Sequence, residues 1–246
     1  MSFKILFLFL TLLISAQSQK YDQNSIIDIL KSFLQKNVPN EIVLNFFEYL
    51  KTLQKKEFPT HLSENRKGFK NHLATIKANN GYIEDQNNYK DMSYGDYTLS
   101  YNGCELIAIY NALYELTKKN DIDFAQIIDI HEKNGILING VFGTSMKTIE
   151  QYFIKNGFPT KSSSIKDDYE QIAKNSDVLI LTIYNNKDDI MAQIHTIAIT
   201  KKNGLYFVHN NSANPPSVGY TSFTNALNSI NSGKAKDLFL IGINKK

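Results

Sequence analysis

The chain has 246 residues, of which 42% are hydrophobic and 21% are charged, and its formal net charge is +3. This length suits one domain with a smaller accessory region, and it is sufficient to bury a hydrophobic core. The basic excess is mild and scattered, with no basic stripe interleaved with aromatic residues, which argues against a nucleic-acid partner.

The N-terminus has the pattern of a secretory signal peptide. Lys4 supplies a positive charge, residues 5–14 are almost entirely apolar, and residues 15–18 offer a small-residue cleavage site. A membrane anchor is the alternative, but the apolar run is shorter than a helix needs to cross a bilayer. We therefore expect a signal peptide over residues 1–18. The mature chain is then expected to be secreted, or delivered to a vacuole or lysosome, with no membrane attachment.

Three amphipathic helices are predicted before residue 81. Apolar residues recur at helical spacing through residues 22–57, and a proline at position 39 divides this stretch into two helices. A third helix is predicted over residues 64–78. Its core face is expected to comprise Phe69, Leu73 and Ile76. Residues 81–103 are polar and aromatic with several turn formers, and they are interpreted as an extended linker.

The chain changes character after Gly103, where a helix over residues 105–118 is apolar on most sides and is expected to be buried. Further helices are predicted over residues 123–133, over residues 145–155 with Thr144 or Ser145 as the N-cap, and over residues 222–231. Buried-type strands are predicted over residues 178–184, 194–200, 205–208 and 238–243. A Lys-Lys-Asn-Gly turn joins the second and third of these strands as a hairpin. The pattern predicts an α+β fold in which an early central helix packs on a C-terminal antiparallel sheet.

Cys104 is the only cysteine of the chain, and it lies at the predicted start of the central helix. A single cysteine cannot form an intrachain disulfide, so a secreted chain has a thiol left over for another purpose. The partial positive charge of a helix N-terminus favours thiolate over thiol, which is the state a nucleophile needs. The alternative is a small buried cysteine that only fills the core.

His195 is the preferred partner of Cys104, because it opens a strand that is expected to face the central helix. Residues beyond the following strand fold back towards the same end, so Asn210, or else Asn211, is the candidate that orients the imidazole. Asn210 also begins an Asn-x-Ser glycosylation sequon, and a glycan there would prevent this role. The alternative for His195 is a structural role at the start of its strand. The alternative for Asn210 and Asn211 is that they only form a turn.

Stabilisation of a developing oxyanion requires hydrogen-bond donors. The main-chain N–H of Cys104 is the first candidate, and the side-chain amide of Asn102 is the second, although an Asn before Gly is also a common turn former. No metal or organic cofactor is expected, because the histidines and carboxylates show no ligand spacing.

The segment around Cys104, the Gly143-Thr144 turn and the strand that begins at His195 together resemble the bacteriocin-processing branch of the papain-fold cysteine peptidases. The resemblance implies a papain-like peptidase domain over residues 98–246, with Cys104, His195 and Asn210 as the catalytic residues. Two positions depart from the family pattern. Thr98 stands where the family has a glutamine that donates to the oxyanion, and Glu105 stands where the family often has glycine.

Residues 19–97 resemble the cathepsin propeptide inhibitor domain. The Phe69, Ile76 and Asn80 spacing and the Asn-Tyr-Lys-Asp-Met-Ser run at residues 88–93 carry this resemblance. It implies a helical pro-region that lies across the active-site cleft, so that the chain's own N-terminal region acts as an intramolecular inhibitor. The alternative is an unrelated three-helix cap.

The leading hypothesis is therefore a secreted cysteine peptidase that hydrolyses peptide or protein substrates through a thioester acyl-enzyme. Two alternatives stay open. One is a catalytically weak papain-fold protein that binds peptides or inhibits peptidases, and the other is a thiol amidase or acyltransferase with a non-peptide substrate.

Overall fold

The computed structural model describes residues 26, 28–29, 32–33, 38–53, 57–185, 194–211, 216–230 and 235–246. The chain divides into two compact units, Met1–Val38 and Pro39–Lys246. The expected signal peptide lies outside the described residues, as does most of the first expected amphipathic helix. The residues of that helix that are described as helical are Ile26, Asp28, Ile29, Ser32 and Phe33.

An antiparallel sheet organises the second unit, and its strands among the described residues follow the order β3-β8-β4-β5-β6-β7. The four central strands confirm the four predicted ones, to within two residues at each end. All neighbouring strands are antiparallel, as predicted. The sequence analysis missed the two edge strands, β3 and β7, because short edge strands carry no alternating apolar pattern. The strands are β3 (Thr160–Ser163), β4 (Val178–Tyr184), β5 (Ile194–Lys202), β6 (Leu205–His209), β7 (Gly219–Tyr220) and β8 (Lys236–Ile243).

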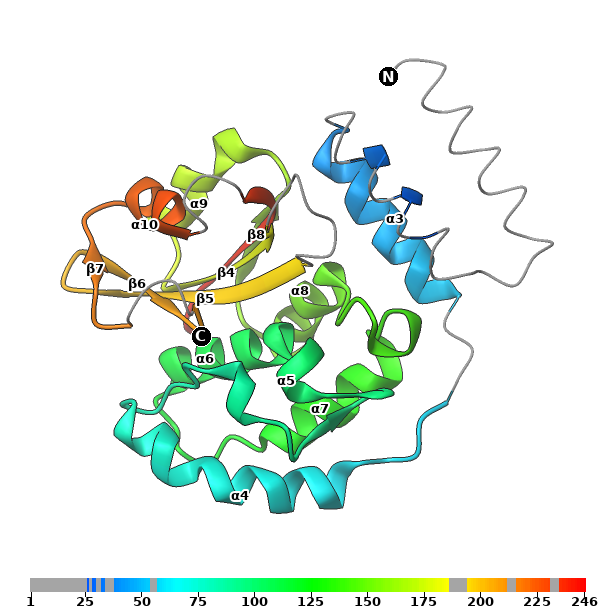
Figure 1. Cartoon of the computed structure of the whole chain (residues 1–246). Helices are drawn as coiled ribbons and strands as arrows, with labels where there is room; N and C mark the ends of the chain where they lie inside the picture. The colour runs from blue at the N-terminus through cyan, green and yellow to red at the C-terminus, as the bar shows by residue number, and fades with distance from the viewer. Residues whose placement is uncertain are drawn as a thin grey trace. The chain divides into compact units, whose positions relative to one another are not determined.

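Helices cover both faces of this sheet (Figure 1). On one face, α9 (Tyr169–Lys174) and α10 (Phe223–Ser229) enclose a core with Leu181, Ile197 and Leu240. On the other face, α6 (Cys104–Thr117) runs against β5 and β4. The buried residues of α6 lie on most sides of the helix, which confirms the prediction of a buried central helix. The molecule is thus a mixed α+β fold, as the sequence predicts.

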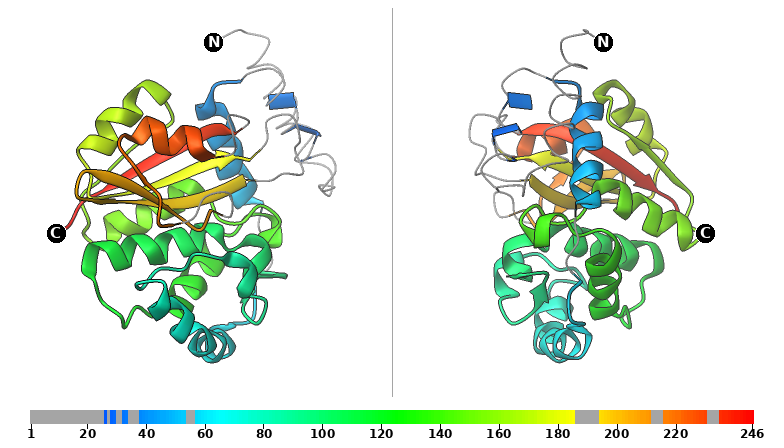
Figure 2. Two further views of the ribbon diagram at one scale, coloured as in Figure 1. Left: turned by 60° about the vertical axis from the view of Figure 1, so that its left-hand side comes forward. Right: turned by 90° about the vertical axis from the view of Figure 1, so that its right-hand side faces the viewer.

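Further helices surround α6 on its side of the sheet (Figure 2). One of them begins at a predicted N-cap, since Ser145 accepts the N–H of Thr148, and in another Asp123 caps the helix by accepting the N–H of Gln126. The helices on this side are α4 (Leu62–Ala78), α5 (Leu99–Asn102), α7 (Phe124–Asn134) and α8 (Met146–Lys155), whereas α3 (Asn40–Thr52) packs against β8 and α8. Helices α4, α6, α7 and α8 agree with their predicted ranges to within about two residues, whereas α3 ends at Thr52, before the predicted end at residue 57.

The buried face of α4 differs from the predicted one. Leu73 is 44% exposed, whereas Asn65 and Gly68 are buried beside Ile76. Gly68 allows this close approach, because a Cβ there would lie 2.9 Å from Met92 Cγ. Asn65 replaces apolar packing with a reciprocal pair of hydrogen bonds to the main chain of Ser93, at 2.8 and 2.9 Å.

The prediction of an extended linker over residues 81–103 is wrong. This segment contains the 3₁₀ turn η1 (Gln86–Asn88), the hairpin of β1 (Ser93–Tyr94) and β2 (Tyr97–Thr98), and helix α5. Its large apolar side chains belong to the core rather than to solvent. The residues at or below 3% exposure are Ile83, Tyr89, Met92, Tyr94 and Leu99.

No boundary between compact units falls at residue 97, where the expected pro-region ends, because the second unit begins at Pro39. Helix α4 packs on α7, and Arg66 forms an ion pair with Asp123 at 2.6 Å. At the start of α3, Asn40 donates to the main-chain carbonyl of Asp237 on β8 at 2.8 Å. Residues 57–97 are therefore built into the same unit as the expected peptidase domain.

Candidate functional site

Cys104 lies at the first position of α6, directly after the short helix α5. Gly103 joins the two helices, and a Cβ at this position would lie 2.4 Å from Leu99 Cγ, so only glycine fits without a shift. The Cys104 side chain is 5% exposed, and its Sγ is placed at the end of α6 that meets the start of β5.

Two kinds of group surround Cys104 Sγ. The thiol donates to Glu105 Oε2 at 3.3 Å, and Sγ lies 4.0 Å from the carbonyl oxygen of Ile194 on β5. Burial raises the pKa of the Cys104 thiol well above its usual range, and the Glu105 carboxylate raises it further. The main-chain N–H of Thr196 acts in the opposite direction, because it stabilises the thiolate. The thiolate favoured by the helix N-terminus is therefore not the resting state of this site.

Glu105 is a buried carboxyl group, 2% exposed, at the second position of α6. Burial raises the pKa of Glu105 to about 7, although main-chain N–H groups of Glu105 and Thr144 stabilise its charge. The loop before α8 approaches this carboxylate closely at Gly143, where φ is +65° and a Cβ would lie 2.5 Å from Glu105 Oε2. The sequence shows this carboxylate beside the cysteine, and the structure shows that it points at the thiol.

Replacing Glu105 by Gln is expected to make Cys104 more reactive at alkaline pH. Above pH 7 the Glu105 carboxylate is ionised and opposes the thiolate, so its removal lowers the pKa of Cys104. Alkylation by iodoacetamide at pH 8 to 9 should accelerate by about 10-fold, the change that one pKa unit gives. Below about pH 6 the difference should shrink, because Glu105 of the unsubstituted protein is then neutral.

The control for this experiment is Glu150→Gln on α8, whose carboxylate accepts from Ser162 and has no contact with Cys104. Cys104 of this control should be alkylated at the same rate as Cys104 of the unsubstituted protein at every pH. An unchanged or slower alkylation of Glu105→Gln above pH 7 would contradict the electrostatic role assigned to Glu105.

His195 lies at the start of β5, between the two residues whose main chain approaches Sγ. Its Nε2 is 2.9 Å from the carbonyl oxygen of Asn210. A carbonyl only accepts, so Nε2 carries the proton and Nδ1 of the neutral ring keeps its lone pair. Burial lowers the pKa of His195, which keeps the ring neutral. Within the described part of the chain, Cys104 Sγ and the imidazole share no hydrogen bond.

Asn210 meets His195 through its main chain rather than through its side chain. The Asn210 side chain is instead bound by Gln86, whose N–H donates to Asn210 Oδ1 at 3.0 Å. Asn210 is only 4% exposed, so the folded chain does not present its amide for glycosylation. Asn211 is buried next to it at 9% exposure, and the imidazole Nε2 meets Asn210 rather than Asn211.

The amide of Asn102 is occupied by the protein. Its Nδ2 donates to the carbonyl oxygens of Tyr94 at 3.0 Å and Gly140 at 2.8 Å, so both amide hydrogens are used within the fold. Thr98, which stands in the place of the family's glutamine, pairs its hydroxyl with that of Ser100 at 2.8 Å. The main-chain N–H of Cys104 thus stays the candidate donor for an oxyanion.

The space beside the thiol is small. A pocket of about 20 Å³ lies at Cys104, and apolar side chains of Val141, Phe142 and Ile194 contribute to its wall. Tyr101 also lines it, is 41% exposed, and stacks on Tyr97 with ring centroids 4.7 Å apart. The thiol is therefore reached past an aromatic and apolar rim.

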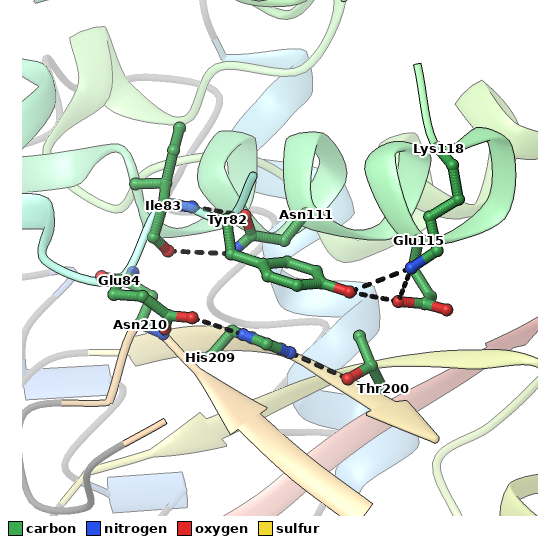
Figure 3. Close-up of polar contacts among 9 residues, drawn as sticks. All are labelled: Tyr82, Ile83, Glu84, Asn111, Glu115, Lys118, Thr200, His209 and Asn210. Atoms are coloured by element: carbon green, nitrogen blue, oxygen red, sulfur yellow. Dashed lines mark hydrogen bonds and ion pairs between the residues drawn. The ribbon is translucent and has the colours of Figure 1, made fainter. Parts of the chain in front are cut away.

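A second cluster, which the sequence analysis missed, lies further along α6 (Figure 3). His209 Nδ1 is 2.7 Å from Glu84 Oε1, and its Nε2 is 2.9 Å from Thr200 Oγ1. Tyr82 stacks on the His209 ring at 4.1 Å and donates to Glu115. These residues line a pocket of about 720 Å³. No local pattern links Glu84 to His209, because 125 positions separate them in the chain.

Among the described residues, no group of three or more His, Cys, Asp or Glu side chains could hold a metal ion. No described helix is long and apolar enough to cross a bilayer. In the comparisons with known proteins, the chain matches no family model, no curated protein and no solved structure.

Proposed function

We propose that this protein is a papain-like cysteine peptidase, secreted or delivered to a vacuole or lysosome, that hydrolyses peptide bonds. Cys104 is the nucleophile and His195 the general base, and the main-chain carbonyl of Asn210 takes the orienting role expected of its side chain. The placement of Cys104 at the start of a buried helix, against an antiparallel sheet that carries His195, supports a papain-like fold.

One observation carries the proposal, namely the hydrogen bond between His195 Nε2 and the Asn210 carbonyl. It holds the ring in the tautomer in which Nδ1 accepts a proton. The thiol lies against the main chain on both sides of His195, at Ile194 and Thr196. The main chain on both sides of His195 thus approaches the thiol, and the Asn210 carbonyl orients the imidazole, which supports the assignment of these residues as nucleophile, base and orienting group.

The reaction begins when the thiol turns from Glu105 towards His195. Nδ1 takes the Sγ proton as Sγ attacks the carbonyl carbon of the substrate, and the oxyanion receives hydrogen bonds from the start of α6. The C–N bond then breaks, and the imidazolium gives its proton to the leaving amine. Water attacks the resulting thioester, with His195 taking the water proton and returning it to Sγ.

A second candidate function is peptide binding without turnover. It is favoured by the hydrogen bond from Cys104 to Glu105 and by the raised pKa of the thiol, both of which oppose a nucleophile. In that case the aromatic rim around Tyr101 would hold a peptide, and Cys104 would contribute only to packing.

Alkylation of Cys104 by iodoacetamide, followed by mass spectrometry between pH 5 and pH 9, tests the proposed pair. Because His195 accepts the thiol proton, His195→Ala is expected to slow alkylation near pH 7 by about 10-fold or more. Equal rates for the two proteins at every pH would refute the pair and would favour the second candidate.

A further inference from the structure

The segment that precedes α5 is fixed to α6 and to the end of β6. Residues 82–88 of this segment are termed the strap. Asn111 on α6 accepts the N–H of Ile83 at 2.8 Å and donates to its carbonyl at 2.9 Å, as a neighbouring strand would. Tyr82 donates to Glu115, also on α6 (Figure 3).

Glu84 binds the strap to the end of β6. Its two carboxylate oxygens bind different groups, since Oε1 pairs with His209 Nδ1 at 2.7 Å and Oε2 accepts the N–H of Asn210 at 3.1 Å. His209 is 4% exposed, and its other nitrogen is bound to Thr200. A carboxylate that accepts two hydrogen bonds from consecutive residues holds the end of β6 in one orientation.

Asn210 has a left-handed backbone conformation, and the strap holds it there. Its φ is +57°, in a region that asparagine adopts more readily than most other residues except glycine. Glu84 binds its N–H, and Gln86 binds both ends of its side-chain amide, at 3.0 and 3.4 Å. The strap therefore holds the N–H and the side chain of Asn210, while its carbonyl is presented to His195 Nε2 at 2.9 Å.

We propose that Glu84 is a positioning residue, which holds Asn210 in the conformation that orients His195. This inference rests on the proposed function, for which the orientation of His195 matters. It also implies that the strap stays in the working protein, so a maturation cut that removes all of residues 19–97 would dismantle the support of the base. A processing cut compatible with this role falls before Tyr82.

The test compares Glu84→Gln with Glu170→Gln. The first substitution removes the negative charge that binds His209 and Asn210. Glu170 is the matched control, because its carboxylate also accepts a main-chain N–H and a side-chain group, both of Thr224, between α9 and α10. Two quantities are measured on the full chain, namely the rate of Cys104 alkylation near pH 7 and the ¹⁵N chemical shifts of the His195 ring. The ring shifts report the tautomer independently of any reaction.

Glu84→Gln is expected to slow alkylation by about 10- to 100-fold, because misplacing a catalytic group by a fraction of its contact distance has effects of this order. The His195 ring shifts should move towards the average of the two tautomers. Glu170→Gln should change neither quantity. Unchanged ring shifts in Glu84→Gln would overturn the positioning role, even where His195→Ala slows alkylation and the proposed pair therefore stands.

The experiment also distinguishes a failure of the proposed function from a failure of the positioning role. If His195→Ala leaves alkylation unchanged but Glu84→Gln still shifts the His195 ring signals, the proposed function fails while the positioning of His195 by Glu84 is supported. Urea denaturation of both variants shows whether each retains the native fold, since only folded variants give interpretable ring shifts.

Discussion

Peptide hydrolysis is expected to fall by about 10³-fold or more when Cys104 is replaced by Ser, the order of loss seen when a catalytic nucleophile is removed. The hydroxyl is smaller and far less acidic than the thiol, so it attacks the carbonyl poorly at the same position. Because Cys104 is buried and the two side chains have similar size, the fold should persist. Release of peptide fragments, measured by mass spectrometry, gives the rate.

His72→Ala is the control for this experiment. His72 lies on α4, where its Nε2 is 2.7 Å from Asp91 Oδ1, and it makes no contact with the thiol. Turnover by His72→Ala should equal that of the unsubstituted protein. Turnover by Cys104→Ser at the unsubstituted rate would show that another residue, or a contaminating peptidase, carries the activity.

Asn111→Leu is expected to lower the free energy of unfolding by about 2 to 6 kcal/mol. The substitution removes both partners of Ile83 and leaves its buried N–H and carbonyl unsatisfied, each at a cost of about 1 to 3 kcal/mol. Asn111 is 0% and Ile83 is 1% exposed, so water does not replace the lost bonds. Urea denaturation should show a lower midpoint with an unchanged slope.

The matched control is Asn134→Leu on α7, which removes an exposed amide that donates to the carbonyl of Ile130 at 2.9 Å. Its effect should stay within about 0.5 kcal/mol, as for most surface substitutions. A loss below about 1 kcal/mol in Asn111→Leu would mean that the strap contributes little to the fold, contrary to its burial.

The regular elements could be predicted from the sequence because each has a periodic pattern. β4 is an almost continuous apolar run, the other three central strands each contain a shorter apolar stretch, and α6 is apolar on most sides. The structure of residues 81–103 could not be predicted in this way. Ile83, Tyr89 and Met92 are spaced irregularly among turn formers, and they are buried against α4, α6 and α7, a surface that exists only in the folded chain.

The candidate site was also predicted only in part. The sequence predicted that His195 and Asn210 lie close together, and the structure joins them by a hydrogen bond, while the pairing of His195 with Cys104 stays a prediction. It did not predict that the Asn210 carbonyl, rather than the side chain, meets the imidazole, because this depends on the left-handed backbone at Asn210. Nor did it predict the direction of Glu105, which follows from the close approach of the loop at Gly143.

Incubation of the unsubstituted protein with a pool of synthetic peptides, followed by mass spectrometry, tests the central claim most directly. If Cys104 is an active nucleophile, peptide fragments accumulate with time, and prior treatment with iodoacetamide stops their release. If the peptides remain intact between pH 5 and pH 9 while Cys104 is unmodified and the chain is folded, the protein is not a peptidase.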